Sequence, residues 1–162
     1  MDSLNNHIEE YMIQLGKGQI QKAYKGIMVY MTGLRTYLED RHPDAITSAL
    51  YFGYMDMTYF AFTPSGLRDR KLKIAIVYLH ESGRFEVWLG GGNRKIQAEY
   101  IDLLSRKDTG RYKLSQVSPG VDSIIESTLV EHPDFDHPGE LNGQIEKKTI
   151  EFIDDVISIL GD

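Results

Sequence analysis

Hydrophobic side chains are densest between residues 51 and 89, where three short runs are rich in aromatic and β-branched residues. Residues of these types pack well on the pleated surface of a sheet. The pattern predicts an antiparallel meander with strands over residues 50–62, 72–80 and 84–89. The second strand is apolar on both faces, which is typical of a central strand.

Ser82 and Gly83 predict a tight hairpin between the second and third strands, because this dipeptide suits a two-residue turn. Such a turn pairs Tyr78 with Val87. Strand alternation then gives the third strand one apolar face, formed by Phe85, Val87 and Leu89, and one mixed face, formed by Arg84, Glu86 and Trp88.

Apolar residues at helical spacing precede and follow the meander. Ser3 suits the cap of a first helix, Gly16 and Gly18 end it, and a second helix runs to the break at His42 and Pro43. A helix over residues 93–105, two short strands over 112–117 and 123–130, and a C-terminal helix follow. We therefore predict one α+β domain over residues 1–162, in which an N-terminal helical hairpin, a middle helix and a C-terminal helix pack on an antiparallel sheet.

The inward phases of these patterns predict the core, namely Ile74, Ile76, Phe85, Val87, Phe152 and Val156. The sheet supplies more large apolar residues than a few short helices cover. Because uncovered apolar patches commonly mark interfaces, we also expect a homodimer.

Charge and composition narrow the classes of function. The chain has 18 Lys and Arg against 24 Asp and Glu, a net charge of -6, which argues against a broad surface for nucleic acid. Cysteine is absent, so disulfides and thiolate catalysis are excluded. The N-terminus does not resemble a secretory signal, and the apolar runs are too short to span a membrane. We expect a cytoplasmic protein that does not enter a membrane.

Three segments resemble a known family: GYMDMTYF at residues 53–60, RFEVWL at residues 84–89 and NRKIQ at residues 93–97. These segments are similar to those of uncharacterised bacterial and archaeal proteins that are grouped as a domain of unknown function. The similarity extends over most of the chain. The resemblance implies a prokaryotic, soluble, single-domain protein. It implies no activity and no functional residue.

The loop before the last helix gathers two imidazoles and three carboxylates, at His132, Asp134, Asp136, His137 and Glu140. These are ligand types for zinc, manganese or iron. Their spacing matches no established metal motif, and carboxylates also favour a helix N-terminus. A polar loop that starts a helix is the better interpretation, so we assign no metal site and no cofactor.

A glycine triplet lies between a predicted strand and a predicted helix, an order that suits anion binding at the helix N-terminus. The candidate residues are Gly91, Gly92, Asn93, Arg94 and Lys95. The sequence lacks the glycine–lysine–serine or threonine signature and the βαβ context of phosphate loops. A flexible turn beside a solvated basic helix face remains the simpler interpretation.

Catalytic signatures are incomplete. Asp56 and Glu86 lie on neighbouring strands as in some metal-dependent nucleases, but Trp88 stands where such a site needs a lysine to orient water. A G-x-S-x-G turn for serine catalysis is absent. The sequence thus leaves open whether the protein is an enzyme.

The leading hypothesis is a non-catalytic ligand-binding or protein-interaction domain. One alternative is a small-molecule enzyme that uses the carboxylates of Asp56 and Glu86, and another is a nucleic-acid-associated module that uses Arg94, Lys95 and Arg106. If the strand faces coincide, a small polar ligand with an amine or planar ring would stack on Trp88, in a site formed by Tyr54, Asp56, Arg84, Glu86 and Trp88. The competing interpretation is that Arg84 pairs with a carboxylate across the strands and that Trp88 packs under a helix.

Overall fold

The computed structural model describes residues 2–161 and contains an antiparallel sheet with helices on both faces. The strands follow one another in the sheet in the order β1-β2-β3-β4-β5, which confirms the predicted α+β meander. None of the helices in the described residues has the length and apolar character needed to cross a lipid bilayer. In chain order the elements are α1 (Leu4–Lys17), α2 (Gln19–Arg41), β1 (Ile46–Thr47), β2 (Met57–Thr63), α3 (Ser65–Arg68), β3 (Leu72–Leu79), β4 (Arg84–Gly91), α4 (Arg94–Leu104), β5 (Ser123–Val130) and α5 (Pro138–Leu160).

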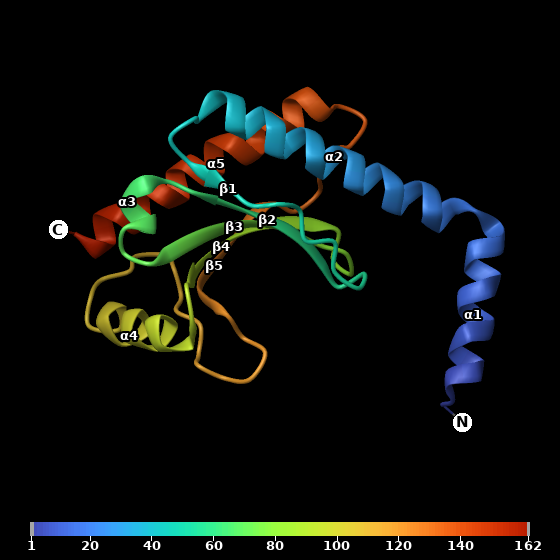
Figure 1. Ribbon diagram of the computed structural model, residues 1–162, viewed down its shortest axis with the longest axis horizontal. Coiled ribbons are helices and arrows are strands. Elements are labelled where there is room, and N and C mark those ends of the chain that lie inside the picture. The colour runs from blue at the N-terminus through green and yellow to red at the C-terminus, as the bar shows by residue number, and fades with distance from the viewer. Residues whose placement is uncertain (1, 162) are drawn as a thin grey trace.

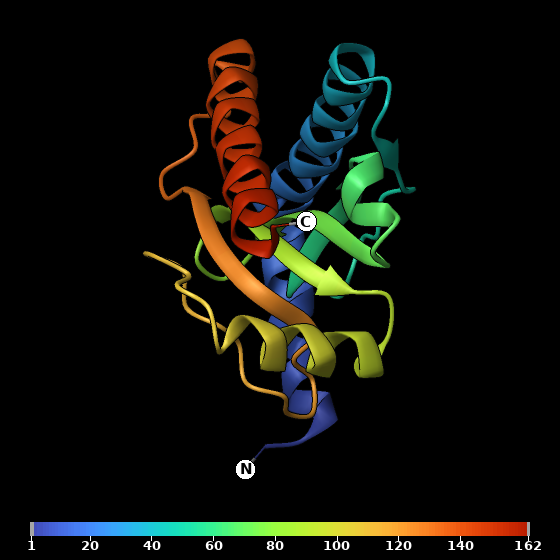
Figure 2. The same cartoon turned by 90° about the vertical axis from the view of Figure 1, so that its left-hand side faces the viewer.

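Helices cover one face of the sheet and leave the other face partly open. α2 and α5 lie side by side across one face, and α4 lies on the opposite face (Figures 1 and 2). The hydrophobic core fills the space between the sheet and the α2–α5 pair. The six predicted core residues are at most 2% exposed, which confirms this part of the prediction: Ile74, Ile76, Phe85, Val87, Phe152 and Val156.

The first two helices do not form the expected hairpin. Ser3 caps α1 as predicted, since its side chain accepts a hydrogen bond from the Asn6 backbone N–H. Gly18 alone joins α1 to α2, with a left-handed φ of 80°. A helical hairpin needs a longer loop, so α1 leaves α2 at a steep angle and points away from the body (Figure 1). No residue of α1 is buried.

The predicted strand over residues 50–62 is interrupted by a turn. β2 begins only at Met57, and Tyr51 folds back to form an isolated bridge with Tyr59. Gly53 adopts a φ of 77°, and a Cβ at this position would lie 1.9 Å from the Met57 carbonyl oxygen. Gly53 therefore makes a tight turn possible at a place where a residue with a side chain would be strained.

The hairpin between β3 and β4 has a four-residue loop instead of the predicted two-residue turn. Leu79 pairs with Arg84, and Tyr78 pairs with Phe85. Gly83, with a φ of 69°, donates its N–H to the Leu79 carbonyl. The pairing differs from the prediction by an even number of positions, so every β4 side chain keeps its predicted face.

Of the two later strands, only the second is a full member of the sheet. β5 spans the predicted residues and pairs with β4. In the stretch predicted as a strand over residues 112–117, the pairing is an isolated bridge between Leu114 and Ile125.

Candidate ligand-binding site

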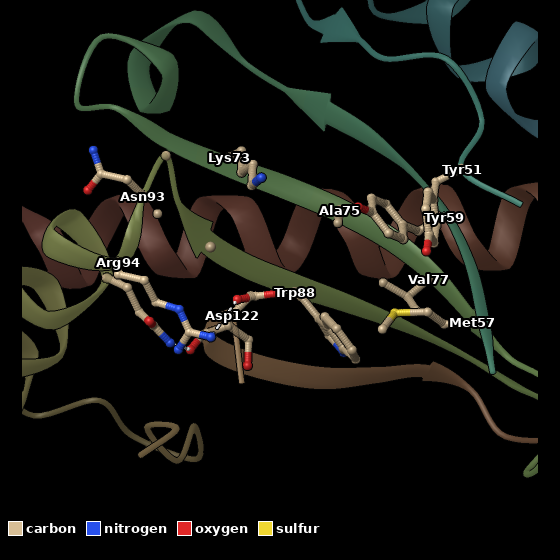
Figure 3. A pocket seen from close by; sticks show the side chains of 15 residues that line it. Tyr51, Met57, Tyr59, Lys73, Ala75, Val77, Trp88, Asn93, Arg94 and Asp122 are labelled. Carbon is tan, nitrogen blue, oxygen red and sulfur yellow. Dashed lines mark hydrogen bonds and ion pairs between the residues drawn. The ribbon is translucent and has the colours of Figure 1, made fainter. Parts of the chain in front are cut away.

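The face of the sheet opposite α2 and α5 carries a hollow next to α4. Its volume is about 470 Å³, within the range of small-molecule sites. Figure 3 shows side chains of β2, β3 and β4 along its floor, with the start of α4 at one end. Residues from strands, a preceding loop and a helix N-terminus therefore converge on one concave surface.

Small residues in adjacent strands create this space. Lys73 of β3 pairs with Gly90 of β4, and Ala75 pairs with Trp88. A Cβ added at Gly90 would meet its nearest neighbours at 3.6–3.8 Å, which is ordinary contact. The surface is therefore concave at Gly90 and Ala75, because these residues have little or no side chain and the surrounding residues have larger ones.

Aromatic and aliphatic side chains form one end of the hollow. Figure 3 shows Tyr51, Tyr59, Met57, Val77 and Trp88 grouped at this end. The rings of Tyr51 and Tyr59 lie with their centroids 5.0 Å apart, which follows from the bridge between these two residues. Trp88 is only half-buried. This end can therefore accept a flat apolar group against an aromatic wall.

A hydrogen-bonded row along β4 fixes the indole of Trp88. Its Nε1–H donates to Glu86 Oε1 at 2.8 Å, and Arg84 Nε donates to Glu86 Oε2 at 2.7 Å. Glu86 is 4% exposed, so its charge is balanced by Arg84 instead of by water. Because the indole N–H is already used, Trp88 offers the hollow its ring and not a hydrogen bond.

The opposite end of the hollow is polar. Lys73, Asn93, Arg94 and Asp122 lie there (Figure 3). Arg94 is occupied, because its Nη1 donates to the carbonyls of residues 118 and 121 and its Nη2 lies 3.4 Å from the Asp122 carboxylate. The side chain of Lys73, in contrast, forms no hydrogen bond or ion pair among residues 2–161.

Gln97 is buried beneath this polar end and is 1% exposed. Its Nε2 donates to the carbonyls of Val121 and Ser123 at 2.9 and 3.0 Å. Its Oε1 has no hydrogen-bond partner within the described residues, although the residue lines the hollow. An unpaired buried acceptor is costly, so this oxygen would gain from a donor.

The glycine triplet has a packing role. A Cβ at Gly91 would lie 2.6 Å from the backbone nitrogen of Gln97, so only glycine allows β4 to end against the first turn of α4. Asn93 caps α4, and its side chain accepts from the Ile96 N–H. Of the predicted anion-binding residues, Gly91, Gly92, Asn93 and Arg94 line the hollow. Lys95 does not, and its Nζ lies 4.0 Å from Glu99.

The structure keeps only part of the predicted ligand site together. Arg84, Glu86 and Trp88 share a face, but Asp56 does not join them. Thr58 pairs with Tyr78 and is buried on the core side of the sheet, and Asp56 precedes β2 in the same phase as Thr58. Met57 and Tyr59, which have the opposite phase, face the hollow instead.

Tyr54 and Asp56 lie in the loop before β2. Tyr54 is 90% exposed, and its N–H donates to the Asp56 carboxylate at 2.9 Å. Backbone hydrogen bonds from Tyr54 and Met57 hold the pKa of Asp56 below its ordinary value. The two-carboxylate site that supported an enzyme is therefore absent from the structure.

Four residues that line the hollow were not predicted from the sequence as site residues: Tyr51, Tyr59, Lys73 and Gln97. Lys73 carried a usable signal, because it shares the strand phase of Ala75 and Val77 within a strand that is otherwise apolar. Gln97 carried none, since its burial depends on the chain segment that follows α4.

The other candidate sites are occupied by local pairs. In the loop before α5, His137 Nδ1 and Asp134 Oδ2 form a 2.7 Å hydrogen bond that lowers the pKa of Asp134. Residues 2–161 contain no cluster of three or more potential histidine or carboxylate metal ligands. The three basic residues of the nucleic-acid alternative each pair with a carboxylate: Arg94 with Asp122, Lys95 with Glu99, and Arg106 with Asp102.

Comparison with known proteins shows the family of the chain. No curated protein and no solved structure matches the sequence. A family model matches residues 4–160, which is nearly the whole chain and includes every residue that lines the hollow. The chain therefore belongs to the family described as a domain of unknown function, DUF7000.

Proposed function

We propose that the protein is a binding domain for a small molecule that places a flat, apolar part against Trp88 in the hollow of the open sheet face. The observation that carries this proposal is the hollow itself, with its small-residue floor at Ala75 and Gly90 and its half-exposed indole wall. Concave sites with an apolar lining and a few polar groups are the usual form of ligand sites.

The rigidity of the wall supports the proposal. Glu86 holds the indole of Trp88, and Glu86 is in turn held by Arg84, so the ring needs little reordering when a ligand arrives. A site that is already ordered loses less entropy on binding. The residues that line the hollow include no histidine, and Asp122, their only carboxylate, is paired with Arg94. The proposal is accordingly one of binding and not of catalysis.

Trp88 is the only tryptophan in the chain, so its emission reports on the hollow directly. The test is a titration with N-phenyl-1-naphthylamine, a neutral and flat aromatic probe. We expect saturable energy transfer from Trp88 to the probe. Two variants fill the floor, Gly90→Val and Ala75→Leu, and each should weaken probe binding at least about tenfold, which corresponds to the loss of roughly 1.4 kcal/mol of binding free energy.

Gly143→Ala is the control, because it adds side-chain volume outside the hollow, at a glycine of α5 with nothing within 4 Å of the added Cβ. This variant should bind the probe as the wild type does. The use of two filling variants guards against one of them failing to fold, which circular dichroism would reveal. Probe binding that is unchanged in both folded variants, or no energy transfer in the wild type, would reject the proposal.

A further inference from the structure

The chemical class of the ligand follows from the charges at the polar end of the hollow. We infer that the ligand is a flat, largely apolar ring system that carries one anionic group, and that Lys73 binds this group. This inference rests on the proposed function. The ring lies at the end formed by Tyr59 and Trp88, and the anion lies at the end next to α4.

Lys73 is the free cation of this site. It stands opposite Gly90 in the β3–β4 pair, and its Cε lies 3.7 Å from the position that a Gly90 Cβ would occupy. The lysine stem thus lies over Gly90, along the floor of the hollow. No carboxylate within residues 2–161 pairs with the ammonium group. Arg94 and Asp122 largely cancel one another, so Lys73 sets the local charge.

A second observation marks the same end as a place for a ligand and not only for packing. Gln97 lines it with a buried Oε1 that has no hydrogen-bond partner among the described residues. A ligand that carries an N–H or O–H between its ring and its anionic group would supply the missing donor. Such a donor would recover part of the cost of burying this oxygen.

The net charge of the protein does not explain a preference for an anionic ligand. The chain carries a net charge of -6, so its general electrostatic field disfavours anions. A preference for an anionic ligand over its neutral analogue must therefore come from a local group. Lys73 is that group, and replacing it should remove the preference without closing the hollow.

The experiment compares two probes that share the same rings and the same bridging N–H. 8-Anilinonaphthalene-1-sulfonate carries a sulfonate, and N-phenyl-1-naphthylamine does not. Dissociation constants come from energy transfer from Trp88. We expect the wild type to bind the sulfonate probe about tenfold more tightly than the neutral probe, as for one charge-assisted contact. Lys73→Met should make the two affinities equal.

Lys95→Met is the matched control, because Lys95 carries the same charge on α4 but does not line the hollow. It should keep the preference for the sulfonate probe. Equal affinities of both probes in the wild type, or a preference that survives Lys73→Met, would overturn the inference while the proposed function stands. If neither probe receives energy from Trp88, or if Gly90→Val and Ala75→Leu leave both affinities unchanged, the proposed function itself fails.

Discussion

Trp88 donates its indole N–H to Glu86 at 2.8 Å, within a single strand and on the face that carries the hollow. The two residues are spaced i, i+2, so strand alternation places them side by side. The buried carboxylate meets two donors, the indole and the Arg84 guanidinium, and satisfies both. This row orders the wall of the proposed site.

Glu86→Gln should destabilise the protein, because the new amide N–H₂ would face a donor from Arg84 or from Trp88. We expect a loss of about 1–3 kcal/mol in the free energy of unfolding, together with a changed emission maximum of Trp88. Urea denaturation and fluorescence measure both. Glu81→Gln is the control, since Glu81 is exposed in the β3–β4 loop and its side chain has no hydrogen bond or ion pair among residues 2–161, so the variant should lose no more than about 0.5 kcal/mol. Equal effects of the two substitutions would mean that the hydrogen bonds of Glu86 with Arg84 and Trp88 do not stabilise the protein.

Phe152→Ala tests the core on the other side of the sheet. Phe152 is 2% exposed and meets the ring of Tyr112 edge to face at 5.4 Å. Its truncation leaves a cavity and should cost about 3–5 kcal/mol of unfolding free energy in urea denaturation. Ile157→Ala lies on the same helix at 40% exposure and should cost less than about 1 kcal/mol. A small effect at Phe152 would show that α5 does not pack on the sheet in this way.

Strand faces could be predicted from the sequence because side chains alternate with period two. The hairpin loop was predicted with the wrong length, yet Glu86 and Trp88 were assigned to the correct common face. An even change of register moves neighbours along the strand but does not exchange the faces. The helix cap at Ser3 of α1 could also be predicted from the sequence.

The face of the sheet to which Asp56 belongs could not be predicted, because it depends on how β2 pairs with β3, where Thr58 lies opposite Tyr78 on the core side. The sequence of residues 50–62 reads as one strand, but the bridge between Tyr51 and Tyr59 folds it back on itself. That bridge brings Tyr51 beside Tyr59 at the hollow. The polar end of the hollow could not be predicted either, because it forms through a contact between residues that are farther apart in the sequence. Gln97 hydrogen-bonds to residues 121 and 123, which follow α4 by almost twenty positions.

His80 should make stability depend on pH near neutrality. Thr58 donates its hydroxyl proton to the Phe52 carbonyl, so the 2.8 Å contact with His80 Nε2 requires the imidazole to donate. Burial lowers the pKa of His80 below its ordinary value of 6.5, and the nearby Asp56 opposes this shift only in part. As the pH falls below about 6.5, the unfolded chain gains a proton that the folded protein resists, so stability decreases.

His80→Gln removes this titration while its amide can still donate to Thr58. The wild type should lose more unfolding free energy than the variant between pH 7.5 and pH 5.5 in urea denaturation. Carboxylates whose pKa is lowered, such as Asp134, titrate at lower pH and affect both proteins alike. Parallel losses in the two proteins would show that His80 does not cause the dependence.

The sequence led us to expect a dimer from uncovered apolar residues of the sheet, and we now propose that self-association runs through α1, because its apolar stripe is not buried by the described residues. A helix of 14 residues is marginal in isolation and normally gains its stability from packing. A second copy offers the same stripe, so a symmetric pair of α1 helices would bury both. The stripe consists of Leu4, Ile8, Tyr11, Met12 and Leu15.

Ile8→Glu should therefore shift the protein from dimer to monomer in sedimentation equilibrium at micromolar concentration, because it places a charge in the middle of the stripe. Ile13→Glu is the matched control. Ile13 lies on the same helix at a similar exposure, 55% against 43%, but five positions away and thus about 140° around the helix axis. Both variants add the same charge, so only the position differs. A wild type that stays monomeric at high micromolar concentration, or a dimer that tolerates Ile8→Glu as well as Ile13→Glu, would mean that α1 does not pair with itself.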